Sequence, residues 1–227
     1  MRHCIITLLV FLGAIRLPAE PMVGNQFQIS LPNHVLRFQL PIAILQEMKR
    51  GQIRTELDLL SPTFFKAGFS DLVYHGHDYR GPLWIGAYGT LEFAIRVIRR
   101  ENGYSGKIHS KDELESYLRW WINRRQTPLH LVFSRKTIGV IPSQWIQRRA
   151  SEFDSGSKVA GANAREICIY STPLDNDLFL EIAFTTTEWK ERSRVKWKSQ
   201  ADALREEILL GIQIIGTNNT PAAETKN

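Results

Sequence analysis

The sequence predicts an α+β domain in which an antiparallel sheet is flanked by helices. Three observations lead to this prediction: short alternating strands at the start of the chain, a long alternating strand near its middle, and two amphipathic helices after it. A chain of 227 residues with 43% hydrophobic and 23% charged residues is typical of one globular domain. The sequence contains no internal repeat or heptad run, which argues against solenoid and coiled-coil classes.

The N-terminal segment has the composition of a secretory signal peptide, which we place at residues 1–19. A basic pair precedes an apolar run over 4–15, and Leu17-Pro18-Ala19 offers a small residue at the cleavage position. The run is too short to span a bilayer, so we expect export to the periplasm and no stable membrane anchor. The alternative is a buried N-terminal strand of a cytosolic protein. The domain then covers 20–216, and the polar segment 217–227 is expected to be a disordered tail.

Charge and cysteine content restrict the possible partners. Removing the signal peptide takes away Arg2 and Arg16, which lowers the formal net charge from +6 to +4. The remaining basic pairs are scattered along the chain rather than gathered, so we expect no nucleic-acid partner. The mature chain keeps only Cys168, which excludes an internal disulfide. Because Cys168 lies in an apolar, strand-like segment, a buried inert thiol is favoured over a nucleophile.

The chain opens with two predicted strands and a short helix. The alternations at 27–30 and 35–40 are separated by Pro32-Asn33-His34, and this arrangement predicts an antiparallel hairpin. A weak helical spacing follows over 41–49. Polar residues and a glycine after this segment mark its end.

The middle of the chain combines an aromatic segment, a polar loop and the longest strand. Residues 64–74 are apolar and aromatic, and the glycine-bounded polar stretch 75–82 is predicted to be a loop. Residues 84–99 alternate between apolar and mixed side chains, which predicts a long strand at the centre of the sheet. Its core-facing residues are Leu91, Phe93, Ile95 and Val97.

The best-defined helix begins after Ser110. Ser110 and Glu113 have the spacing of a capping box, in which each side chain satisfies a free backbone amide of the first turn. The apolar stripe that follows has helical spacing and contains Leu114, Tyr117, Leu118, Trp121 and Ile122. The remaining predicted elements are a hairpin at 129–134 and 137–141, an exposed loop at 151–164, a strand pair at 165–171 and 177–186, and a last helix over 197–212.

Side chains that can bind metals gather at Asp71, His75, His77 and Asp78. The His-Gly-His motif could place two imidazoles near one cation. No third histidine follows at a recognisable spacing, so an exposed polar loop is favoured over a metal site. The sequence also lacks nucleophile-elbow, phosphate-loop and His-Glu-x-x-His motifs. We therefore expect a protein that is not an enzyme and that needs no cofactor or metal.

Two aromatic patches are predicted to contact a partner protein, because Trp, Tyr and Arg are enriched where proteins bind one another. Trp120 lies one position off the apolar stripe and is expected to be an exposed anchor beside Arg124 and Arg125. Core packing is the alternative for every tryptophan, and we favour it for Trp121 and Trp197. The other patch is the predicted loop, with His75, His77, Asp78, Tyr79, Arg80 and Trp84.

The two ends of the domain carry a resemblance to a known fold. The opening hairpin contains Phe-x-Ile-x-Leu-Pro at 27–32 and Phe-x-Leu-Pro at 38–41. The closing strand, 178–184, is followed by Trp197 and the apolar stripe of the last helix. Over residues 25–215 this order of elements resembles the Mog1/PsbP-like α/β fold. The resemblance implies a curved antiparallel sheet flanked by helices, as an α/β/α sandwich, but it carries no functional motif and implies no site residue.

The resemblance also implies a class of function. Exported proteins of this fold include bacterial periplasmic proteins and immunity proteins that neutralise effectors delivered by type VI secretion. We therefore expect a non-catalytic binding protein, and specifically an immunity protein whose partner is a toxin or effector. Two alternatives stay open, because fold does not determine function. One is an accessory or assembly protein of a larger envelope complex, and the other is a metal-dependent hydrolase that uses His75, His77 and Asp78.

Overall fold

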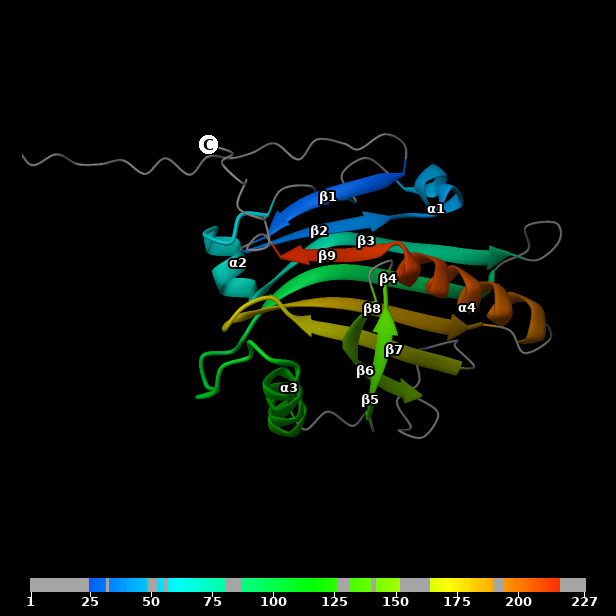
Figure 1. The fold of residues 1–227 in the computed structure, drawn as a ribbon. Coiled ribbons are helices and arrows are strands. Elements are labelled where there is room, and N and C mark those ends of the chain that lie inside the picture. Colours follow the sequence, from blue (N-terminus) through cyan, green and yellow to red (C-terminus); the bar gives the residue numbers. More distant parts are fainter. Residues whose placement is uncertain are drawn as a thin grey trace, which may run out of the picture.

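Two antiparallel sheets and four helices make up the part of the chain that the structure describes (Figure 1). The structure is a computed structural model, and it describes residues 25–31, 33–48, 53–54, 57–80, 87–125, 131–139, 142–151, 164–189 and 194–216. This architecture confirms the predicted α+β class with a large curved antiparallel sheet. The predicted signal peptide 1–19, the predicted tail 217–227, nearly all of the predicted loop 151–164, and Trp84 lie outside the described residues.

The larger sheet has six strands in the order β3-β4-β8-β7-β6-β5, and each strand is antiparallel to its neighbours. The strands are β3 Phe69–Arg80, β4 Ala87–Arg99, β5 Val132–Ile138, β6 Ser143–Ser151, β7 Ala164–Pro173 and β8 Leu178–Glu188. The predicted long strand corresponds to β4, and the predicted strand pair corresponds to β7 and β8. The core positions predicted for β4 are all buried, so this strand is a central element of the sheet as expected.

The smaller sheet has three strands in the order β1-β2-β9. Strands β1 Gln26–Leu31 and β2 His34–Gln39 form the predicted hairpin. The third strand, β9 Ile212–Gly216, pairs with β2 and begins at the residue where the last helix was expected to end. The helix ends at Leu210, and the next residue must be small because a Cβ on Gly211 would lie 2.7 Å from the carbonyl oxygen of Gln39. The Gln39 amide also donates to the Gly211 carbonyl at 3.0 Å. The chain thus leaves the helix beside β2 and pairs with it as a third strand.

Four helices complete the described structure: α1 Ile42–Glu47, α2 Pro62–Ala67, α3 Lys111–Arg125 and α4 Arg194–Leu210. The predicted capping box of α3 is present. Ser110 Oγ accepts from the Glu113 amide at 3.3 Å, and Glu113 Oε2 accepts from the Ser110 amide at 3.0 Å. Within the predicted stripe, Leu114, Tyr117 and Leu118 are buried, while the last two residues are half-buried.

Replacing Ser110 by Ala is expected to lower the free energy of unfolding by about 1 kcal/mol, because the Glu113 amide loses its acceptor. The matched control is Ser116→Ala in the same helix. Ser116 Oγ donates to the Asp112 carbonyl one turn earlier and caps nothing, and Ala is the better helix former. Urea titrations should therefore show a lower midpoint for Ser110→Ala only. Equal losses in both variants would contradict the capping assignment.

The helices α4 and α3 cover opposite faces of the larger sheet. On one face, alternate residues of β4 and β8, such as Phe93 and Ile182, form a core with Trp197 and Ile208 of α4 and with the small sheet. On the other face, Phe179 belongs to a second core that includes α3 residues. We call these the α4 face and the α3 face. Strand alternation therefore decides which helix each sheet residue meets.

The predicted loop at 75–82 is wrong over its first part, because residues 75–80 belong to β3. His75 pairs with Phe93 and His77 pairs with Leu91 on β4. His75 and His77 therefore point to the α4 face, while Gly76 and Asp78 point to the α3 face. The alternation is genuine, but polar residues occupy both sets of positions, so a hydrophobic pattern does not reveal the strand.

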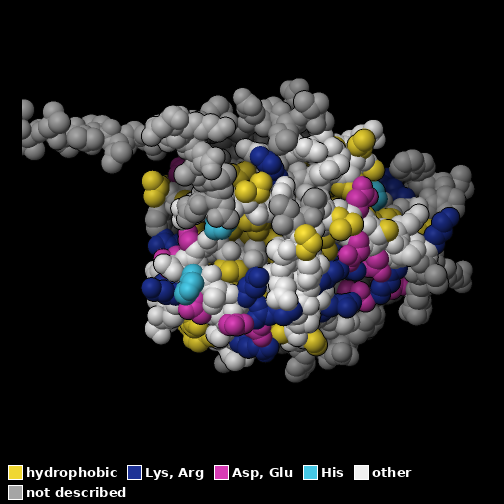
Figure 2. All heavy atoms as spheres, viewed as in Figure 1, with side chains coloured by type: hydrophobic (Ala, Val, Ile, Leu, Met, Phe, Trp, Pro, Cys, Tyr) yellow, Lys and Arg dark blue, Asp and Glu magenta, His cyan; other side chains and the backbone are white. Residues whose placement is uncertain are grey.

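The predicted hairpin at 129–134 and 137–141 is also wrong, because β5 runs through the expected turn and pairs with β6. Arg135 ion-pairs with Asp112 and Glu115 of α3, at 2.9 and 2.7 Å. Lys136 points the other way and lies 2.6 Å from Glu206 of α4. Two consecutive charged residues thus fit a strand because each face supplies acidic partners. In Figure 2, basic and acidic side chains are interspersed over this part of the visible surface.

Candidate functional site

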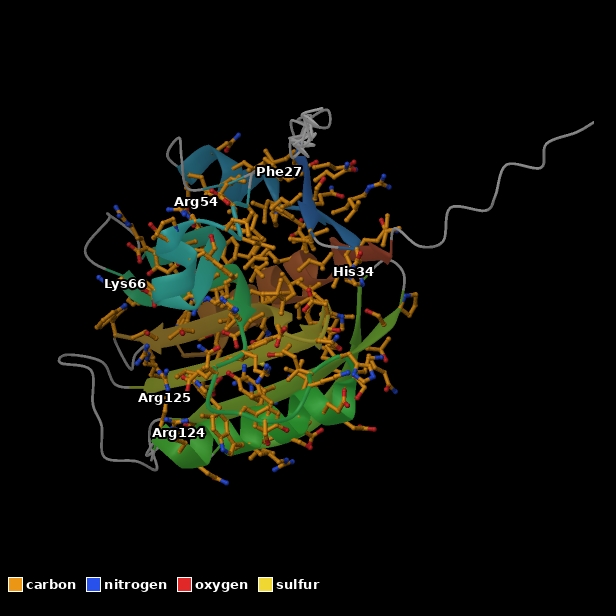
Figure 3. The ribbon with its side chains drawn as sticks, turned by 90° about the vertical axis from the view of Figure 1, so that its left-hand side faces the viewer. Phe27, His34, Arg54, Lys66, Arg124 and Arg125 are labelled. Carbon is orange, nitrogen blue, oxygen red and sulfur yellow. The ribbon has the colours of Figure 1, made fainter. Side chains whose placement is uncertain are left out.

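The two predicted partner-binding patches lie on different faces of the larger sheet. On β3, His75, His77 and Tyr79 point to the α4 face, where the Tyr79 ring lies 5.8 Å from that of Trp197. The second patch is on α3, and Figure 3 shows Arg124 and Arg125 together at one end of that helix. The two patches therefore do not form one continuous contact surface.

The first patch is organised around a carboxylate that the sequence did not indicate. Glu47, the last residue of α1, places Oε2 2.7 Å from His77 Nδ1 and 3.5 Å from His75 Nε2. The three side chains can offer one ligand atom each within 4.8 Å of one another. Neither spacing nor motif could find Glu47, because only folding brings the end of α1 to β3.

His75 is the buried member of this cluster, with 4% of its surface exposed. Neither of its ring nitrogens makes a hydrogen bond within the described residues, and the Glu47 carboxylate lies 3.5 Å from Nε2. Burial lowers the pKa of His75, although the nearby Glu47 carboxylate acts in the opposite direction. The imidazole is therefore held toward its neutral form, with a lone pair available.

Tyr79 borders the same cluster. Its ring lies 4.7 Å from that of His77 in an edge-on arrangement, and its hydroxyl is buried with no hydrogen-bond partner in the described part of the chain. Burial raises the pKa of Tyr79, and the Glu47 carboxylate raises it further. The hydroxyl is thus neutral and can donate a hydrogen bond to a group that enters the cluster.

The structure separates the remaining residues of the predicted loop from this cluster. Asp78 lies on the α3 face, where its Oδ1 accepts from Thr90 Oγ1 at 2.8 Å and its Oδ2 lies 3.7 Å from Arg80 Nη2. Asp71 instead pairs with Arg96 at 3.2 Å. The predicted grouping of His75, His77 and Asp78 is therefore wrong in its third member, and Glu47 takes that place.

The second patch joins α3 to the turn that follows β4. The Trp120 ring lies 5.2 Å from the Tyr104 ring, and the Arg124 guanidinium lies 5.2 Å from the centre of Trp120. Arg125 lies 4.5 Å above the ring of Trp121. We call these five residues the α3 surface. Trp120 is half-buried rather than a free-standing anchor, because Tyr104 packs beside it.

Glu101 holds the end of this surface in place. Its Oε1 accepts from Arg125 Nη2 at 2.6 Å and from Trp121 Nε1 at 2.9 Å. The hydrogen bond from Arg125 lowers the pKa of Glu101, and the bond from Trp121 acts in the same direction. Sequence reasoning missed Glu101 and Tyr104 because both lie in a turn that approaches α3 only in the folded protein.

Comparison with known proteins identifies no family for this chain. No protein-family model matches it, and no curated protein matches it either. A crystal structure from Bacteroides thetaiotaomicron VPI-5482 is similar at a TM-score of 0.30 and 14% identity. The match covers 67% of this chain and 47% of that one, so it spans about half of that protein's length. A likeness this low supports no statement about function.

Among the described residues, no helix is both long enough and apolar enough to cross a bilayer.

Proposed function

We propose that this chain is a non-catalytic, exported binding protein that neutralises a toxin or effector by direct contact through the α3 surface. The observation that carries the proposal is the stacking of arginines on aromatic rings. Arg124 and Arg125 lie over Trp120 and Trp121, and Arg119 lies 4.1 Å above Phe133. Trp, Tyr and Arg dominate the binding energy of many protein interfaces.

Stacking also prepares these side chains for binding. An arginine held over a ring has lost part of its rotamer freedom before the partner arrives, so less entropy remains to be lost on association. Arg119 is in addition held by Glu115 at 2.7 Å. The planar guanidinium suits bidentate contact with carboxylates, so the expected partner surface is acidic. The resemblance to exported immunity proteins supports a toxin as that partner.

The proposal is tested by capture followed by affinity measurement. Residues 20–227 serve as bait for an envelope extract, and mass spectrometry identifies the captured protein. A single stoichiometric secreted enzyme, whose activity the bait inhibits, is the expected result. A membrane complex as the captured species would instead support an accessory protein, and inhibition without direct binding would contradict the proposal.

With the captured partner, Trp120→Ala and Arg124→Ala are each expected to weaken the affinity between the two proteins at least tenfold, which corresponds to about 1.4 kcal/mol. Arg37→Ala is the matched control, because Arg37 is an exposed arginine on the small sheet whose Nε donates to Gln28 at 3.0 Å. Isothermal titration calorimetry measures the affinities, and thermal melts confirm that the variants fold. Unchanged affinity in both α3 variants would remove the α3 surface as the contact site.

A further inference from the structure

We infer that Glu47, His75 and His77 form a binding site for one divalent transition-metal ion of the zinc class, which joins the end of α1 to β3. The proposal goes beyond the binding function of the α3 surface. It rests on three potential ligand atoms within 4.8 Å of one another. These atoms come from two elements that are distant in sequence, the last residue of α1 and two inward positions of β3.

The second observation is the state of His75. Only 4% of the surface of His75 is exposed, yet neither ring nitrogen has a hydrogen-bond partner in the described structure. Its Nε2 faces Glu47 Oε2 at 3.5 Å. A buried imidazole that makes no hydrogen bond loses the ones it would make with water. A metal ion between His75 and Glu47 would satisfy the Nε2 lone pair.

The type of ion follows from the ligands. Two imidazole nitrogens and one carboxylate suit zinc and its first-row neighbours, whereas Ca²⁺ and Mg²⁺ favour sites made of oxygen ligands. The observed separations are also suitable. Glu47 Oε2 lies 2.7 Å from His77 Nδ1, and an ion that bonds both atoms would need only a small opening of this pair. A fourth position remains for water.

The surroundings favour binding over a solvent-exposed acidic cluster. The two histidines lie in a strand whose register with β4 is continuous through both positions, so their spacing is set by the sheet. Phe93 packs against His75 with ring centres 6.0 Å apart, and Tyr79 packs edge-on against His77. These contacts fix the imidazole orientations, which lowers the entropy lost when a metal binds. Glu47, on the exposed side, provides the entry path because 45% of its side chain is accessible.

The test uses the purified full chain and zinc or cobalt as the probe. Calorimetry should show one Zn²⁺ per chain and no binding of Mg²⁺ or Ca²⁺. Co²⁺ should produce the visible absorption bands of a nitrogen-ligated site. Glu47→Gln and His77→Ala should each weaken zinc binding at least tenfold, because even outer-shell changes reduce metal affinity by roughly 10- to 100-fold. Both replaced side chains are partly exposed, so these variants are expected to fold.

The matched control is His109→Ala. His109 Nδ1 lies 2.7 Å from Glu113 Oε2, the same atoms at the same distance as in the His77 and Glu47 pair, but the described residues place no second histidine with them. Zinc affinity should be unchanged in this variant. The melting temperature of the native chain and of His109→Ala should rise with zinc concentration, while that of Glu47→Gln should rise less at the same zinc concentration. Absence of zinc binding, or equal binding by the native chain and Glu47→Gln, would overturn the proposal.

Discussion

Replacing Arg148 by Met is expected to lower the free energy of unfolding by about 3–5 kcal/mol, because it leaves the Glu181 carboxylate buried without its main partner. Arg148 is 2% exposed and Glu181 is 7% exposed. Arg148 Nη2 bonds Glu181 Oε2 and also donates to Ser171 Oγ at 3.0 Å. Among the described residues, a second cation near Glu181 is Arg96, whose Nη1 is 3.9 Å away. Arg96 is already paired with Asp71 and compensates only in part.

Urea unfolding at neutral pH measures this loss, and a double variant identifies its cause. Arg148→Met combined with Glu181→Leu removes both charges and should recover most of the lost stability, since apolar residues of similar volume often replace a buried pair without loss. Arg37→Met, an exposed arginine on β2, should change stability by less than about 0.5 kcal/mol. If the double variant were as unstable as Arg148→Met alone, lost packing rather than an unpaired charge would be responsible.

The second large effect is expected where α4 crosses β4. A Cβ on Gly89 would lie 2.3 Å from the ring of Trp197, which is 4% exposed and packs within the core of the α4 face. Gly89→Ala should therefore destabilise by about 1–3 kcal/mol through overpacking. Trp197→Ala should cost about 3–5 kcal/mol, because it leaves a cavity beside Tyr79.

The two changes should not be additive. Once Trp197 is Ala, the methyl group of Gly89→Ala has room, so its penalty should largely disappear in the double variant. Gly76→Ala is the control, because its added Cβ would meet only the Glu92 side chain at 3.6 Å, an ordinary contact. Unfolding of the four proteins of the cycle gives the coupling directly. Additive losses would show that the Trp197 ring is not the reason why a side chain at position 89 destabilises the protein.

The two candidate sites differ in how far the sequence could indicate them. For the α3 surface, Trp120, Arg124 and Arg125 follow one another on a helix, so helical periodicity places them together. Their partners Glu101 and Tyr104 come from a turn and needed the fold. For the cluster of Glu47, His75 and His77, the sequence shows the two histidines as a pair but predicts them in a loop with Asp78. Pairing with β4 makes the segment a strand and places Asp78 on the α3 face, opposite to the two histidines.

The sequence by itself determined the elements that depend on interactions between residues close together in the chain. The capping box at Ser110 and Glu113 acts within one turn, and the alternation of β4 is a two-residue period, so both are present as predicted. Only the tertiary structure decided the elements that depend on distant partners. Strand β9 forms by pairing with the distant strand β2, and β5 tolerates Arg135 and Lys136 because α3 and α4 supply acids. Glu47 lies beside the two histidines for the same reason. Strand pairing and packing between distant segments, rather than neighbouring residues, determine which side chains come into contact.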